Sequence, residues 1–128
     1  MGKTAQKPEV VRSETKFNIK LGEHVYTLNF NTNTFLRIKD AKPELTTAFH
    51  AVEEIPPYEL IPFLIHCAIK PEERKWTSFA ELADLYDDTD DQEAIAKILP
   101  AFMAATGAVT KKIQPALEAV VALHEREK

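Results

Sequence analysis

Cysteine and glycine are scarce in this sequence. One cysteine, Cys67, and three glycines occur in 128 residues. A single thiol can form neither an internal disulfide nor a cysteine-rich zinc site. Phosphate-binding loops need glycines close together, whereas these stand at positions 2, 22 and 107. The scarcity excludes disulfide frameworks, cysteine-based zinc modules and P-loop nucleotide binding.

Side chains for nucleophilic or acid–base catalysis are also few. The serines are Ser13, in a polar N-terminal stretch, and Ser78, at a predicted helix start, and neither lies in a nucleophile elbow. The four histidines show no zinc-ligand spacing, and Cys67 falls in the most apolar predicted helix, where packing is favoured over reactivity. We therefore expect no enzyme activity, no cofactor and no metal.

The chain lacks a basic excess and a long apolar run. Lys and Arg total 16 against 20 Asp and Glu, which gives a net charge of −4. Nucleic-acid binding needs a basic footprint, and a membrane span needs about 18 apolar residues in a row, so neither is expected. No secretory signal pattern occurs at the start. We expect a cytoplasmic protein with a flexible arm over residues 1–15 and a single domain over residues 16–128.

A β-hairpin is predicted over residues 17–30. Two runs alternate apolar and polar side chains around Gly22-Glu23, a pair suited to a two-residue turn because glycine tolerates a positive φ. This turn sets Leu21 opposite His24 and Phe17 opposite Leu28. The predicted buried face carries Phe17, Ile19, Leu21, Tyr26, Leu28 and Phe30.

Everything after Asn31 is predicted to be helical. Expected helices run through residues 31–38, 45–52, 57–69, 78–86, 90–103 and 109–127, with proline or capping residues between them. Ser78 with Glu81, and Asp90 with Glu93, have the capping-box spacing. Pro100 should kink its helix, and Gly107 should either end that helix or be absorbed in it. The fold class is α+β, mostly α-helical, with the N-terminal hairpin packed on a bundle of about four to six helices.

An acidic run spans residues 81–93. Seven acids and no Lys or Arg lie between Trp76 and Ala96. The run fails as an EF-hand, because no start gives glycine at loop position six and glutamate at twelve. A solvated loop whose acids cap the following helix is the favoured interpretation, and docking of a basic partner is the alternative.

Two features are candidates for partner binding. Trp76 stands in a charged loop, where it is either a lid on the core, the interpretation we favour, or a binding anchor. Near the C-terminus, apolar residues recur at helical spacing and should contact a partner or another subunit at least as much as their own core. The candidate partner-binding residues are Trp76, Ile113, Leu117, Val120 and Val121.

The order of elements resembles a known family. The polar arm, the hairpin F-N-I-K-L-G-E-H-V-Y-T-L-N-F, the helix start N-T-N-T-F-L-R-I and the proline-punctuated helices are similar to tail assembly chaperones of long-tailed phages and prophages of Gram-positive bacteria. The resemblance covers about residues 16–113 and rests on an apolar pattern and a turn. It implies a non-enzymatic protein of the host cytoplasm that is absent from the mature virion.

The resemblance also implies partners. Such chaperones bind the long helical tape-measure protein and help recruit tail-tube subunits, and a second, longer form made by ribosomal frameshifting can accompany the short one. Homo-oligomers are possible. The alternative from a different class is a small acidic helical inhibitor or immunity-type protein, which would bind a basic partner through residues 81–93.

Overall fold

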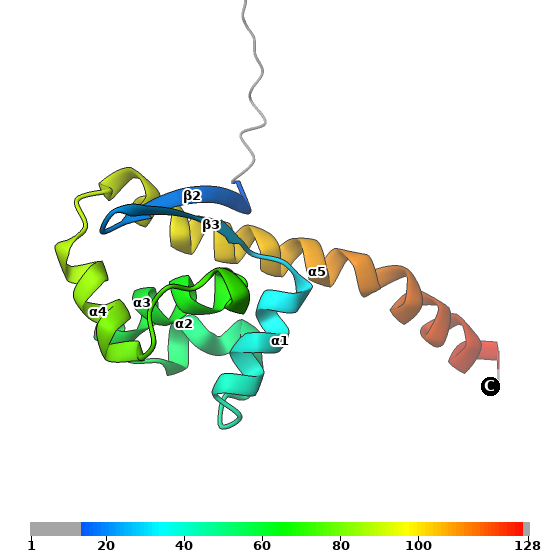
Figure 1. Ribbon diagram of the computed structural model, residues 1–128. Helices are drawn as coiled ribbons and strands as arrows, with labels where there is room; N and C mark the ends of the chain where they lie inside the picture. The colour runs from blue at the N-terminus through cyan, green and yellow to red at the C-terminus, as the bar shows by residue number, and fades with distance from the viewer. Residues whose placement is uncertain (1–13, 127–128) are drawn as a thin grey trace, which may run out of the picture.

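The computed structural model describes residues 14–126, so most of the predicted arm lies outside the described residues. A two-stranded hairpin is followed by five α-helices and two short 3-10 helices within this range (Figure 1). The strands are β2 (Lys16–Leu21) and β3 (His24–Asn29). The helices are α1 (Thr32–Ala41), η1 (Ala48–His50), α2 (Ala51–Glu54), α3 (Pro57–Ala68), η2 (Pro71–Glu73), α4 (Phe79–Asp88) and α5 (Gln92–Arg126). The predicted α+β, mostly helical fold class is confirmed.

The hairpin has the predicted register. Leu21 pairs with His24, Ile19 with Tyr26 and Phe17 with Leu28. Gly22 in the turn has a φ of +63°, a conformation that side-chain-bearing residues rarely adopt. All six residues of the predicted apolar face are buried, and His24 at the turn is exposed.

The apolar face of the hairpin packs on the helices. In Figure 1 the two strands lie along one side of the first half of α5, while α1, α2 and α3 lie on its other side. Phe102 of α5 is fully buried between the two layers, with its ring centroid 6.4 Å from Phe30 and 5.6 Å from Phe35. An isolated hairpin is marginal in water, so these aromatic contacts hold it in place.

Asn31 is the cap that begins α1. Its side chain accepts a hydrogen bond from the backbone N–H of Thr34 at 3.1 Å. The hydroxyl of Thr34, which is fully buried, donates to the backbone oxygen of Asn29 at 2.6 Å. The buried Thr34 hydroxyl therefore has a hydrogen-bond partner in β3, and this bond connects β3 to the first turn of α1.

The continuous helix predicted over residues 45–52 is wrong. Only Ala48–His50 (3-10) and Ala51–Glu54 (α) are helical there. Lys39 Nζ donates to the backbone oxygens of Pro43 and Leu45 at 2.7 and 2.6 Å, which fixes an irregular loop after α1. The helix begins only after Thr47, whose hydroxyl accepts from the Phe49 N–H at 3.1 Å.

Both capping predictions around α4 and α5 need adjustment. Ser78 caps α4 as predicted, but the carboxylate of Glu81 accepts from the N–H of Thr77 rather than Ser78. The predicted cap Asp90 is wrong, because Asp91 Oδ1 accepts from the N–H of Ala94 at 3.2 Å. Asp91 is the cap rather than Asp90 because its second carboxylate oxygen also accepts from the backbone N–H of Lys20 at 3.0 Å, a bond that connects the start of α5 to β2.

Residues 109–126 are helical, as predicted, and of the two outcomes expected for Gly107 the structure shows absorption into one helix. The single helix α5 runs through Pro100, Gly107 and Pro115 for 35 residues, so Gly107 is absorbed. Pro100 removes one N–H from the ladder, yet Pro100 and Ala96, whose carbonyl loses its partner, are both exposed. Water can satisfy that carbonyl, which explains why the helix continues.

Candidate functional site: the projecting segment of α5

The second half of α5 leaves the body of the protein. We call residues 110–125 the projecting segment. Every residue in it is exposed, whereas the first half of α5 contributes Ile98, Ala101, Phe102 and Ala105 to the core. Figure 1 shows this segment extending well beyond the hairpin and the other helices. Its first turn lies beside the body, where Lys112 lines a small pocket with Phe30 and Asn31.

The projecting segment carries an apolar stripe made of Ile113, Leu117, Val120 and Val121. At about 100° per residue these four side chains fall within about 100° of one another around the helix. Their exposed fractions are 49%, 54%, 61% and 56%. The four candidates named from the sequence therefore come together on one helix face. Leu123, which is 55% exposed, lies three residues after Val120 on the flank of this stripe and was missed although it has the 3/4 spacing.

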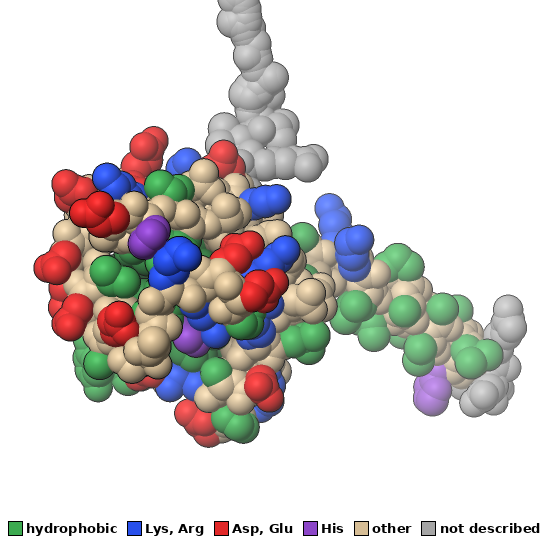
Figure 2. Space-filling model, in the orientation of Figure 1, with side chains coloured by type: hydrophobic (Ala, Val, Ile, Leu, Met, Phe, Trp, Pro, Cys, Tyr) green, Lys and Arg blue, Asp and Glu red, His purple; other side chains and the backbone are tan. Residues whose placement is uncertain are grey.

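The stripe continues the core face of α5. Ile98, Phe102 and Ala105 are buried, Val109 is partly buried against the core, and Ile113 follows four residues later. One apolar face thus begins inside the body and runs on into solvent. Figure 2 shows hydrophobic side chains gathered on the projecting segment, in contrast to the charged surface of the body.

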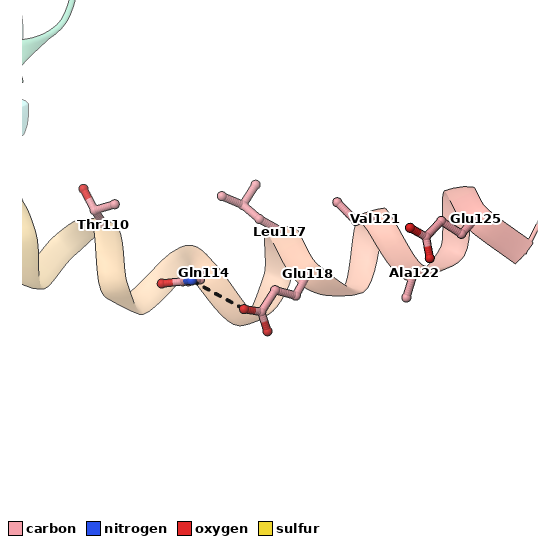
Figure 3. A pocket seen from close by; sticks show the side chains of 7 residues that line it. All are labelled: Thr110, Gln114, Leu117, Glu118, Val121, Ala122 and Glu125. Atoms are coloured by element: carbon pink, nitrogen blue, oxygen red, sulfur yellow. Dashed lines mark hydrogen bonds between the residues drawn. The ribbon is translucent and has the colours of Figure 1, made fainter.

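The face around Leu117 and Val121 is shallow. Figure 3 shows these two side chains pointing to one side of the helix, with Glu118 and Ala122 on the other. Gln114 donates to Glu118 at 3.4 Å, and Glu125 lies at the far end. One helix supplies every wall, so this face is an open surface that fits another helix better than a small molecule.

Exposure on this scale has an energetic meaning. A contiguous apolar patch on a folded protein usually marks a site of protein contact. In proteins most of the stability of a helix comes from packing of its amphipathic face, and every residue of this segment is exposed. A partner that covers the stripe would bury apolar surface and hold the segment helical at the same time.

Trp76 is a lid on the core, as favoured from the sequence. It is only 6% exposed, and its ring centroid lies 5.3 Å from that of Tyr26 in an edge-to-face arrangement. Its indole Nε1–H donates to His66 Nδ1 at 3.1 Å. The structure therefore does not bring Trp76 together with the α5 stripe, and its burial leaves little surface for a partner.

The His66–Cys67 pair shows no catalytic arrangement. Burial, with help from the charges of Arg74 and Arg37, lowers the pKa of His66 from 6.5 to about 4. Burial likewise raises the pKa of the Cys67 thiol to about 12, although the nearby cations oppose this. A protonated thiol is a poor nucleophile, so Cys67 acts as a small core residue.

The depressed pKa of His66 predicts a pH-dependent stability. Below pH 6.5 the unfolded chain protonates this imidazole, whereas the folded chain keeps it neutral to about pH 4. The stabilisation is therefore complete above pH 6.5 and is lost as the pH falls toward 4, by about 1–2 kcal/mol after allowance for partial exposure. Urea unfolding at pH 7.5 and 4.5 measures it. His66→Gln keeps an acceptor for Trp76 but cannot titrate, so an equal loss in both proteins would contradict the prediction.

The acidic run lies on α4 and the loop into α5. Asp91 caps α5, the helix that follows the run, as the favoured interpretation required, whereas Glu81 accepts from the Thr77 N–H at the start of α4. The other five acids, Asp84, Asp87, Asp88, Asp90 and Glu93, are exposed. Among residues 14–126 no group of three or more metal-ligating side chains is placed to hold an ion. The docking of a basic partner stays a prediction.

One described helix has the length and hydropathy of a membrane span. It covers Gln92–Glu125, which is most of α5. Core residues in its first half account for part of this apolar character, since a core helix of a folded domain passes the same test. Its second half is the projecting segment, which carries Lys111, Lys112 and Glu118.

Searches of protein families, curated proteins and solved structures each found no match to this chain.

Proposed function

We propose that this protein is a non-enzymatic assembly chaperone for phage tails, which binds the tape-measure protein and helps recruit tail-tube subunits. The observation that carries the proposal is the apolar stripe on the projecting segment of α5. The resemblance of the hairpin and helix pattern to tail assembly chaperones supplies the identity of the client.

The stripe suits a long helical client. Before a tail tube forms, a free tape-measure protein exposes apolar helix faces to water. Pairing of one amphipathic helix with another buries both faces through contacts spaced three and four residues apart. Ile113, Leu117 and Val120 have this spacing on the part of α5 in which every residue is exposed.

The rest of the surface suits a carrier. A net charge of −4 keeps a protein with an exposed apolar stripe soluble before it meets its client. Tube subunits that compete for the same face would release the chaperone, so it would act in the bacterial cytoplasm, of an infected or lysogenic host, and be absent from the virion. A second copy of the chain could cover the stripe meanwhile, which makes homo-oligomers possible.

Binding to the tape-measure protein encoded near the gene tests the proposal. The triple variant Ile113→Gln/Leu117→Gln/Val120→Gln should weaken this binding about 30- to 100-fold, because it removes three central apolar contacts. The matched control Val25→Gln/Leu36→Gln changes side chains of similar exposure, 63% and 62%, on the body of the protein. The control should bind as the natural protein does.

Deletion of residues 114–128 separates binding from folding. We expect the remaining chain to stay folded, because residues 114–125 are all exposed, and to lose client binding. Circular dichroism and urea unfolding measure the first property, and co-purification the second. Genes for tail-tube and tape-measure proteins should flank this one; their absence, or unimpaired binding by the triple variant, would refute the proposal.

The exposed acids favour a second candidate, an inhibitor or immunity-type protein. Five acids from α4, the following loop and the first turn of α5 are exposed, and no described Lys or Arg forms an ion pair with them. Such a surface can occupy a basic active site. Recovery of a basic enzyme whose binding is lost in Asp84→Asn/Asp87→Asn/Asp88→Asn, but kept in the α5 triple variant, would support this candidate over the chaperone.

A further inference from the structure

A small polar pocket lies apart from the apolar stripe and shares no lining residue with it. It has a volume of about 230 Å³ and is formed where the open end of the hairpin meets the start of α1 and the end of α3. Its charged lining consists of Lys16 of β2, Arg37 of α1, Lys70 after α3 and a single carboxylate, Glu73. Three cations against one anion give a local charge of +2 in a chain whose net charge is −4.

Arg37 is held in place from two sides. Its Nε donates to the backbone oxygen of Cys67 at 2.8 Å, and its Nη2 donates to the hydroxyl of Thr34 at 3.2 Å. Thr34 is itself fully buried and bonded to Asn29, so the anchor is rigid. Arg37 lines the pocket and uses two of its five guanidinium N–H donors in these bonds, so three remain free to donate.

The pocket also has neutral donors. Asn31 and Asn33 line it at the N-terminus of α1. Asn31 uses its side-chain oxygen as the α1 cap, so its amide group is available to donate. Within the described range, no carboxylate forms an ion pair with Lys16, Arg37 or Lys70. Cations that gather without a protein anion between them attract an anion from solution.

We propose that this pocket binds one dianionic phosphate group, either as free phosphate or as a phosphomonoester. The local charge of +2 matches a dianion, and the fixed guanidinium suits the oxygens of a phosphate. The volume is below the roughly 300–1,000 Å³ of sites for drug-sized ligands, so only the phosphate and a few attached atoms fit. This binding is independent of the client surface on α5.

Calorimetric titration of the full chain with inorganic phosphate, in a phosphate-free buffer at pH 7.5, tests the site. We expect saturable binding that Lys16→Gln/Lys70→Gln weakens about tenfold, since two charge-assisted contacts are lost. Glu73→Gln should tighten it severalfold, because it removes the only anion in the lining. The matched control Lys111→Gln/Lys112→Gln makes the same change of charge on the projecting segment and should leave the affinity unchanged.

Three results would overturn the proposal. They are no saturation up to about 10 mM phosphate, an equal loss in the Lys111/Lys112 control, or succinate binding more tightly than phosphate. Methyl phosphate distinguishes the two sources of the group. Binding as tight as that of inorganic phosphate supports a phosphomonoester, whereas binding of inorganic phosphate alone supports the free ion.

Discussion

Leu28→Ala is expected to lower the free energy of unfolding by about 2–4 kcal/mol, through lost transfer energy and the cavity left behind. Leu28 is fully buried on β3, opposite Phe17, in the face that packs on the helices. Folded domains of this size are stable by only about 5–15 kcal/mol, so the variant should lose a large part of its stability. Urea unfolding at pH 7.5 measures the loss.

Val25→Ala is the matched control for Leu28→Ala. Val25 lies on the same strand but on the opposite face, where its side chain is 63% exposed. It should cost less than about 1 kcal/mol. Equal losses at the two positions would mean that both faces of the hairpin are covered, in solution, by something other than the described helices.

The hairpin was predictable because local signals agreed. The period-two alternation chose the buried face, and the Gly22-Glu23 turn fixed the register independently of it. A shift of the strand register by one residue would have placed the side chains of Ile19 and Leu28 on the solvent-exposed face. The buried face and the turn geometry restrict the strand register independently of each other, which explains why the predicted strand pairs are found.

The segment between Pro43 and Pro56 was not predictable in the same way. Its apolar spacing around Leu45 and Phe49 fits a helix, but Lys39 of α1 donates hydrogen bonds to the backbone oxygens of Pro43 and Leu45, which holds this stretch in a loop.

The cap of α5 was likewise decided by a tertiary contact. The capping-box spacing to Glu93 favoured Asp90, but the contact of Asp91 with the Lys20 N–H of β2 selects Asp91 instead. Both outcomes depend on tertiary contacts that no local pattern contains.

Four of the five candidate residues lie together on the projecting segment, whereas Trp76 is buried elsewhere, and their contact with a partner stays a prediction. The 3/4 spacing of Ile113, Leu117 and Val120 indicated a helix face, yet it could not tell a core face from an unpartnered one. The difference comes from the length of α5, which absorbs Gly107 and carries the face out of the body. The cationic pocket had no sequence signal, because Lys16, Arg37 and Lys70 are far apart in the chain.

Trp76→Ala is expected to lower the free energy of unfolding by about 3–5 kcal/mol, the range for large aromatic residues in a core. The indole is almost fully buried against Tyr26, and it donates the hydrogen bond that His66 accepts. The variant would leave a cavity beside Tyr26, and His66 Nδ1 would lose the N–H group from which it accepts. Equilibrium unfolding in urea measures the effect, and far-ultraviolet circular dichroism shows whether the variant still folds.

Trp76→Phe separates packing from hydrogen bonding. It keeps most of the ring volume and removes the N–H, so we expect a loss of about 1–2 kcal/mol, the cost of one unsatisfied acceptor with some lost contact. If Trp76 were a binding anchor, both variants would keep the stability of the natural protein and weaken only its contact with a partner. A stability loss that is large for alanine and small for phenylalanine, with client binding by the phenylalanine variant unchanged, would assign Trp76 to the core and leave α5 as the surface that contacts the client.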